Sequence, residues 1–308
     1  MLAILIGTAI RSAWTPSDAW ANGIEFSAKQ LLEIAVVLLG ASVSAATIFA
    51  AGWALLISIF GIVAAAIVLS FGIGRLLGLT KRLAILVACG NSICGNSAIA
   101  AVAPVIGADG DEVASSIAFT AVLGIIVVLV LPLIGAALRL TQLAYGALAG
   151  LTVYAVPQVL AATAPVGAAA VQIGTLVKLI RVLMLGPVCL LLSLAFPNLR
   201  EEPERAGEVT AGDRPKTARL PTHQLVPWFI IGFLVMIGLR SADLIPSRAL
   251  APIGDLATIL TVIAMAALGL GVDIRSVSKA GGAVTVTVIL SLLALGSVSF
   301  LLIRQLGI

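Results

Sequence analysis

Charge is scarce in this 308-residue sequence: Asp, Glu, Lys and Arg together make up only 10% of it. Soluble domains carry charge on roughly a quarter of their residues, whereas here 61% of the residues are hydrophobic and the mean hydropathy is +1.19. So few charged side chains cannot cover a water-facing surface. The composition therefore excludes an ordinary soluble protein.

Side chains that bind metals or serve enzymes are also scarce. The sequence holds one histidine, His223, and three cysteines, of which Cys89 and Cys94 have a C-x4-C spacing without His, Asp or Glu nearby. Small residues that pack closely explain that spacing better than a metal does. HExxH and GxSxG motifs are missing, and Ser92 and Ser97 have no neighbouring base. We therefore expect no metal, no cofactor and no enzymatic activity.

Long apolar runs, by contrast, are plentiful, and short polar or Gly/Pro turns separate them. A helical span needs about 20 mainly apolar residues, and we count ten candidate segments: 1–10, 30–48, 52–72, 83–107, 113–138, 142–164, 167–197, 224–241, 252–271 and 281–303. Unpaired backbone groups are costly in lipid, and the runs are longer than the roughly 10-residue strands of a membrane barrel, so the spans must be helices. We predict an all-α, polytopic membrane protein.

Two features divide the chain. The first segment, 1–10, is only half a span and lacks a charged start and a cleavage site, so we expect no signal peptide and a missing upstream helix. The one long hydrophilic stretch gives a first membrane half over 1–197, a polar cytoplasmic linker over 198–223 and a second membrane half over 224–308. A regulatory docking site in that linker is an alternative.

The basic residues serve as a topology signal, because the formal net charge of +4 comes without an aromatic-interleaved basic patch and nucleic-acid binding is excluded. If every segment spans, one set of alternate loops holds three basic residues, Arg240, Arg248 and Arg304. The other set holds Arg11, Lys29, Arg75, Lys81, Arg82, Arg139, Arg200, Arg205, Arg214, Lys216, Arg219, Arg275 and Lys279. The positive-inside rule makes the richer set cytoplasmic and places the acidic turn Asp109, Asp111, Glu112 outside.

An internal repeat links the two ends of the chain. Laying Ile34–Phe71 on Ile263–Phe300 without gaps matches eleven of 38 positions. The two copies lie seven segments apart, an odd number, so the second copy would run through the bilayer in the opposite sense. Inverted repeats of this kind are typical of secondary transporters.

The most unusual stretch is Val87–Ala108, in which the tripeptide Gly-Asn-Ser occurs twice within an apolar segment. These residues together are poor helix formers and promote unwinding where the backbone lines a cavity. The half-helix N-terminus at such a break suits an anion. The alternative is that small polar residues only let helices pack closely. We predict a broken helix whose solute site comprises Asn91, Ser92, Gly95, Asn96 and Ser97.

Polar and helix-breaking residues also interrupt segment 142–164. Tyr154, Pro157 and Gln158 stand near its centre, either as the second wall of the binding cavity or as a kink with an interhelical hydrogen bond. A weak echo connects this segment with the Gly-Asn-Ser stretch: AAVAPV before Ile106 resembles AATAPV before Gly167.

Two cations, Lys178 and Arg181, lie one turn apart within the apolar run 166–196. Intramembrane cations are functional by default, and two on one face suit a dianion. The run is longer than a span requires, so both side chains could instead snorkel to the interface. The predicted break, in contrast, carries no carboxylate, although coupled exchangers usually keep one there. That absence argues against sodium/proton antiport and favours an uncharged or anionic substrate.

The same residues carry a family resemblance over nearly the whole chain. CGNSICGNSAIAAVAPVI (Cys89–Ile106), IEFSAKQLLEIAVVLLG (Ile24–Gly40), GLTVYAVPQVLAA (Gly150–Ala162) and AMAALGLGVDIRSV (Ala264–Val277) resemble the sulfate exporter family of bacterial inner-membrane proteins, the YeiH type. The resemblance implies a fold related to the sodium/proton antiporter and bile-acid symporter group, with inverted repeats, broken helices and a further N-terminal helix. Tyr154 stands where the family has a polar, often histidine-bearing position, so no titrating role is carried over.

We therefore expect an alternating-access exporter of sulfate or another small anion in a bacterial inner membrane. Asn91, Ser92, Asn96 and Ser97 would cradle the solute, with Gln158 opposite and Lys178 and Arg181 supplying complementary charge. A cation-coupled symporter of an organic acid and a non-transporting membrane sensor or scaffold are the alternatives. The expected partners are the anion and the bilayer, and a homodimer is left open.

Overall fold

The computed structural model describes residues 2–13, 17–42, 45–195, 228–271 and 282–305, and every regular element in these ranges is helical. The N-terminal elements are α1 (Leu2–Ala13), α2 (Asp18–Phe26), the π-helical η1 (Ser27–Leu31), α3 (Leu32–Leu39) and the 3₁₀-helical η2 (Gly40–Ser42). They are followed by α4 (Ala45–Leu76), α5 (Lys81–Ser92), α6 (Asn96–Ile106), α7 (Gly110–Ala137), α8 (Gln142–Thr152), α9 (Val156–Thr163), α10 (Ala168–Leu183), α11 (Leu185–Ala195), α12 (Trp228–Ser241), α13 (Ser247–Gly271) and α14 (Gly282–Gln305). The predicted all-α class is confirmed for these residues, and the predicted linker 198–223 lies outside them.

Four helical stretches are long and apolar enough to cross a membrane: Ile57–Leu76, Ala168–Leu194, Ser247–Leu270 and Gly282–Gln305. Shorter apolar helices accompany them, and the 28 residues of α7 extend for about 42 Å at 1.5 Å per residue. These lengths agree with a protein that crosses the membrane several times. The prediction of ten spans is not confirmed, because two of the ten segments turn back on themselves.

The predicted span 83–107 is a re-entrant helical hairpin. α5 ends at Ser92, the chain turns over residues 93–95, and α6 returns beside α5. The hydroxyl of Thr80, the N-cap of α5, donates a 2.8 Å hydrogen bond to the Glu112 carboxylate in the first turn of α7. Both ends of the hairpin therefore lie together, and the prediction that this segment crosses the bilayer is wrong. An apolar segment with a central break has the same composition whether it crosses or turns back.

The same hydrogen bond corrects the predicted orientation of the acidic turn. Asp109 and Glu112 form a capping box at the start of α7, and the Thr80 bond places this turn beside Lys81 rather than across the membrane from it. The prediction failed because it assumed that every apolar segment crosses. Arg139 follows the far end of α7, so its predicted side of the membrane changes together with that of the turn.

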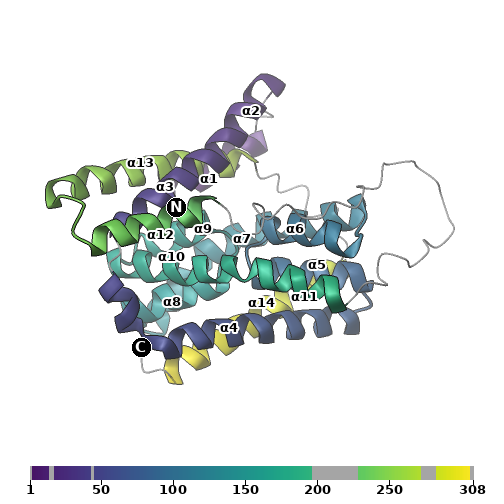
Figure 1. Cartoon of the computed structure of the whole chain (residues 1–308). Helices are drawn as coiled ribbons and strands as arrows, with labels where there is room; N and C mark the ends of the chain where they lie inside the picture. Colours follow the sequence, from purple (N-terminus) through teal and green to yellow (C-terminus); the bar gives the residue numbers. More distant parts are fainter. Residues whose placement is uncertain (1, 14–16, 43–44, 196–227, 272–281, 306–308) are drawn as a thin grey trace.

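The predicted span 142–164 is a second hairpin, made of α8 and α9. The Tyr145 hydroxyl near the start of α8 donates a 2.9 Å hydrogen bond to the Ala162 carbonyl near the end of α9. A Cβ atom built on Gly167 would lie 2.5 Å from the Gln142 Oε1 atom, so the two ends of this hairpin also meet. Figure 1 shows α5 and α6 to the right and α8 and α9 to the left, with α7 between them. The two hairpins thus enter from opposite sides, and the prediction of a crossing at 142–164 is wrong.

Helices from the two ends of the chain pack as antiparallel pairs. α4 lies beside α14 (Figure 1), and a Cβ atom on Gly74, near the end of α4, would lie 3.4 Å from the Thr287 Cγ2 atom near the start of α14. α3 packs on α13, and Leu39 at the end of α3 lines one cavity with Leu250 at the start of α13. These are the elements that the sequence repeat relates to each other.

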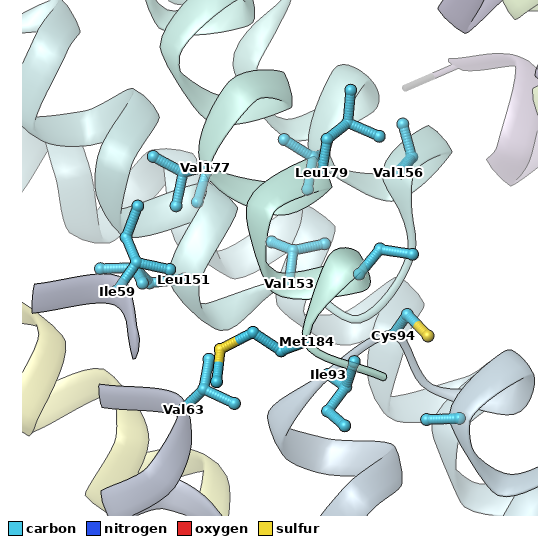
Figure 2. Packing of buried hydrophobic residues seen from close by; sticks show 14 of the residues in the cluster. Ile59, Val63, Ile93, Cys94, Leu151, Val153, Val156, Val177, Leu179 and Met184 are labelled. Carbon is cyan, nitrogen blue, oxygen red and sulfur yellow. The ribbon is translucent and has the colours of Figure 1, made fainter. Parts of the chain in front are cut away.

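α10 lies at the centre of the molecule. It packs along α8 and α9 and also contacts α4 and α11. Figure 2 shows residues of one apolar cluster at this place, among them Ile93 and Val153 from the two hairpin tips and Val177 from α10. Arg181, Lys178 and Tyr154 are nevertheless among the largest fully buried side chains. The centre of the fold therefore combines an apolar shell with buried polar groups.

Candidate functional site

The tips of the two hairpins meet each other. The first tip is Ile93–Gly95, and the second is Val153–Ala155. A Cβ atom added at Gly95 would lie 3.3 Å from the Tyr154 Cβ atom and 3.9 Å from the Thr120 Cβ atom of α7. The candidate site is therefore the junction of the two tips and the middle of α7.

Local residue chemistry explains both turns. Gly95 has φ +66°, a left-handed conformation that glycine adopts without steric cost. In the second hairpin Pro157 stands in the first turn of α9, where its missing N–H leaves no helical bond unmade. The predicted break in the Gly-Asn-Ser stretch is thus confirmed. The helix is also interrupted at 153–155, and a second cavity wall at 154–158 stays a prediction.

Lys178 of α10 connects the two tips. Its Nζ atom donates to the Ile93 carbonyl at 2.5 Å and to the Val153 carbonyl at 2.9 Å. The side chain is fully buried, so the alternative of snorkelling to the interface is wrong for this residue.

Arg181, one turn further along α10, bridges the same hairpins with all of its donor nitrogens. On the first hairpin Nε and Nη2 donate to the Ser92 carbonyl at 3.0 and 2.7 Å, and Nη2 also reaches the Asn91 carbonyl at 3.2 Å. On the second hairpin Nη1 donates to the backbone carbonyls of Gly150 at 2.8 Å, Val153 at 3.5 Å and Leu151. Arg181 is also fully buried, so it does not snorkel either.

The electrostatics of the junction follow from the helix ends. At each tip the negative C-terminal end of one helix meets the positive N-terminal end of the next, each equivalent to about half a charge. Lys178 and Arg181 satisfy the carbonyls of the C-terminal ends, while the N-terminal end of α6 has no side-chain cap. Within the described ranges, neither cation has a carboxylate partner. The guanidinium of Arg181 therefore brings a positive charge to the junction that no acidic side chain there balances.

Three predicted site residues are buried at the junction without partners. Asn91, Ser92 and Tyr154 are 0%, 1% and 1% exposed. Both amide atoms of Asn91 and the hydroxyls of Ser92 and Tyr154 make no hydrogen bond with any described residue. Buried polar groups normally have a partner, so these atoms are candidates for contact with a bound solute.

The remaining predicted residues are Gly95 in the first tip and three residues at the start of the second limbs. Gly95 is buried, whereas Asn96 and Ser97 in the first turn of α6 are exposed. Gln158 in the first turn of α9 accepts a 3.2 Å hydrogen bond from the Ala155 N–H, and its amide packs on Gly124 of α7. The residues thus come from both hairpins, and Asn96 and Ser97 are the exposed members of the set.

Sequence reasoning missed the contribution of α7. The Thr120 hydroxyl donates to the Asn96 amide oxygen, and Ser116, one turn earlier, is fully buried without a partner among the described residues. The AAVAPV and AATAPV echo was the available signal, because both copies fall on the second limb of a hairpin. In that register Thr120 aligns with Arg181. The helix that follows the first hairpin, α7, therefore corresponds to the helix that follows the second hairpin, α10.

No cluster of three or more metal-ligating side chains occurs in the parts of the chain that the structure describes. Cys89, Cys94 and Cys189 are buried and unbonded thiols near the first hairpin. The junction thus combines the side chains of Lys178 and Arg181, bonded to backbone carbonyls, with the unbonded polar groups of Asn91, Ser92 and Tyr154.

Comparisons with known proteins identify the family. The family model described as Conserved hypothetical protein 698 matches residues 1–288. A UPF0324 membrane protein of Brucella melitensis is 59% identical over all of this chain and 82% of its own length, and one of Bradyrhizobium diazoefficiens is 55% identical over 99% and 83%. A UPF0324 membrane protein of Bacillus cereus is 36% identical over 100% and 86%.

No solved structure matches the chain, so the relation to the sodium/proton antiporter and bile-acid symporter group stays a prediction. The relatives cover the chain from end to end and are named membrane proteins, in agreement with its apolar helices. The chain is a multi-pass membrane protein that belongs to the UPF0324 family, which is the YeiH-type family that its sequence resembles.

Proposed function

We propose that the protein is a secondary transporter that moves a small anion, with sulfate as the first candidate, across the membrane by alternating access. The observation that carries this proposal is the burial of Lys178 and Arg181 at the junction of two hairpin tips, without a carboxylate partner among the described residues. A cation deep in a membrane protein is costly unless it is paired. A bound anion supplies the missing charge.

The charge arithmetic favours an anion over a cation. The helix ends at the two tips contribute about two positive and two negative half-charges, which cancel, and Lys178 and Arg181 then leave an excess of positive charge. Asn91, Ser92 and Tyr154 add buried groups that can donate hydrogen bonds. Sodium and proton sites need acidic or carbonyl acceptors, and the carbonyls here already accept from the two cations.

The architecture supports transport rather than a scaffold role. Re-entrant backbone at membrane depth is tolerated where it lies in protein or lines a solute path, and this chain has two such hairpins from opposite sides. The antiparallel packing of α4 with α14 and of α3 with α13 is what an inverted repeat requires. Alternating access proceeds by rocking of such repeats around a central site.

Flux of labelled sulfate into proteoliposomes tests the proposal. Asn96→Ala removes an exposed amide from the junction, and we expect this variant to abolish uptake. Asn22→Ala, at an exposed position of α2, is the matched control and should transport like the parent. Unchanged uptake by Asn96→Ala would refute the site assignment, and absence of flux for sulfate and other oxyanions would refute the function.

Imposed ion gradients separate the anion exporter from the symporter alternative. Sulfate flux that persists without a sodium or proton gradient supports the exporter. Flux of an organic acid that requires one of these gradients would instead support cation-coupled symport.

A further inference from the structure

α10 and the α8–α9 hairpin form one tightly packed body. A Cβ atom on Gly146 would lie 2.6 Å from the Ala170 carbonyl oxygen, and one on Gly150 would lie 2.6 Å from the Gly174 carbonyl oxygen. Gly174 in turn faces the second limb, 3.0 Å from Val159 by the same measure. Glycines that bring backbones this close leave little room for movement between helices.

The tip of the α5–α6 hairpin is attached to that body through long side chains. Lys178 and Arg181 reach from α10 to the carbonyls of Asn91, Ser92 and Ile93. These bonds join the buried turn at 93–95 to α10. They are therefore the contacts that must be exchanged if the two tips separate.

The base of the α5–α6 hairpin, in contrast, is fixed. Thr80 donates to Glu112, and the capping box of Asp109 and Glu112 orders the same turn. Pro104 lies inside α6, two residues before its end, and a proline within a helix is a site of bending. Pro104 is thus a point between the fixed base and the tip at which α6 can bend.

We propose that the tip of the α5–α6 hairpin is the gate of the site, that the carbonyls of Asn91, Ser92 and Ile93 act as resting ligands of Lys178 and Arg181, and that an entering anion displaces them. The inference rests on the proposed anion transport. Hydrogen bonds between a cation and an oxyanion are roughly twice as strong as those between neutral groups, so the anion competes well for the two side chains. Displacement of the carbonyls releases the tip and uncovers Asn91 and Ser92.

Cys94 is a built-in reporter of this movement, because it lies within the moving tip and is buried in the closed structure. A background with Cys89→Ala and Cys189→Ala keeps Cys94 as the only thiol of the chain. A matched background with Cys89→Ala and Cys94→Ala keeps Cys189, which is buried on α11 outside the hairpins. The rate of N-ethylmaleimide labelling in liposomes then reports exposure of the tip in one protein and exposure that extends beyond the tip, to α11, in the other.

Two perturbations are expected to open the gate. Lys178→Gln should raise the labelling rate of Cys94 by about tenfold, as loss of one charge-assisted hydrogen bond predicts, and should leave the rate of Cys189 unchanged. Sodium sulfate should accelerate labelling of Cys94 in the protein with an intact Lys178, relative to sodium gluconate at equal ionic strength. This second measurement needs no substitution in α10.

Other outcomes overturn the gate. Equal acceleration of Cys94 and Cys189 by Lys178→Gln would mean that the fold as a whole has loosened, and no acceleration of either would mean that the cations do not hold the tip. Slower labelling of Cys94 in sulfate would mean that the anion closes the junction. Faster labelling by Lys178→Gln in a protein that transports no anion would retain the gate and refute the proposed function.

Discussion

Replacement of Arg181 by methionine is the substitution whose consequence the structure specifies in most detail. The guanidinium donates to carbonyls at the C-terminal ends of α5 and α8, among them those of Ser92 at 2.7 Å and Gly150 at 2.8 Å. Methionine fills a similar volume but donates nothing. The buried carbonyls would lose their partners, and the two hairpins would lose the bridge between them.

The magnitude follows from the number of groups left without partners. Each buried carbonyl that loses its hydrogen bond costs about 1–3 kcal/mol, and removal of the buried charge offsets part of this sum because its desolvation is relieved. Four carbonyls, those of Asn91, Ser92, Gly150 and Leu151, would lose their bond to Arg181, and after the offset we expect a net cost of about 3–5 kcal/mol. At about 2 °C per kcal/mol for a chain of this size, we expect Arg181→Met to lower the melting temperature by about 6–10 °C.

The loss of helical circular dichroism on heating in detergent measures this melting, because every regular element of the described residues is helical and the signal does not depend on the exposure of Cys94. Arg240→Met is the control: the Arg240 side chain is 33% exposed and pairs at 3.5 Å with Asp243, which is 92% exposed. This control substitution should lower the free energy of unfolding by less than about 0.5 kcal/mol. A melting temperature of Arg181→Met within about 2 °C of the parent would refute the bridging role.

Further substitutions test the tip and the α7 contact. Gly95→Ala should lower the free energy of unfolding by about 1–2 kcal/mol, because φ is +66° and the new Cβ atom would lie 3.3 Å from Tyr154. Gly61→Ala on α4 is the control: no atom lies within 4 Å of its Cβ position, so this variant should melt no lower than the parent. Thr120→Val removes the hydroxyl that donates to Asn96 and should reduce sulfate flux about fivefold, the effect of about 1 kcal/mol, with Thr120→Ser restoring it. Equal melting temperatures for Gly95→Ala and Gly61→Ala, or undiminished sulfate flux in Thr120→Val, would contradict these expectations.

The helical class and the first break could be predicted because they depend on local chemistry. Apolar runs force helices in lipid, and paired Gly-Asn-Ser tripeptides weaken a helix wherever it runs. The reversal of direction at the tips could not be predicted in this way, because it depends on which distant groups meet. Thr80 and Glu112 are far apart in sequence, and nothing local to either indicates their hydrogen bond.

The site was predictable only in part for a related reason. Lys178 and Arg181 could be identified because cations are rare in apolar runs, but their ligands are backbone carbonyls, which every residue possesses. Whether they snorkel or stay inside depends on the helices around α10, and these pack along it closely enough to bury both. Thr120 gave no sequence signal beyond the distant echo, because a threonine within an apolar helix usually bonds its own backbone.

Binding of labelled sulfate to the purified protein at equilibrium tests the central claim most directly, because it requires neither a gradient nor a transport cycle. We predict one saturable site per chain in the parent and in Arg240→Gln. Lys178→Gln should bind at least about tenfold more weakly, since one charge-assisted hydrogen bond to the anion is lost. Equal affinity of Lys178→Gln and the parent, or no saturable binding of any oxyanion to the parent, would contradict an anion site at the junction of the two hairpins.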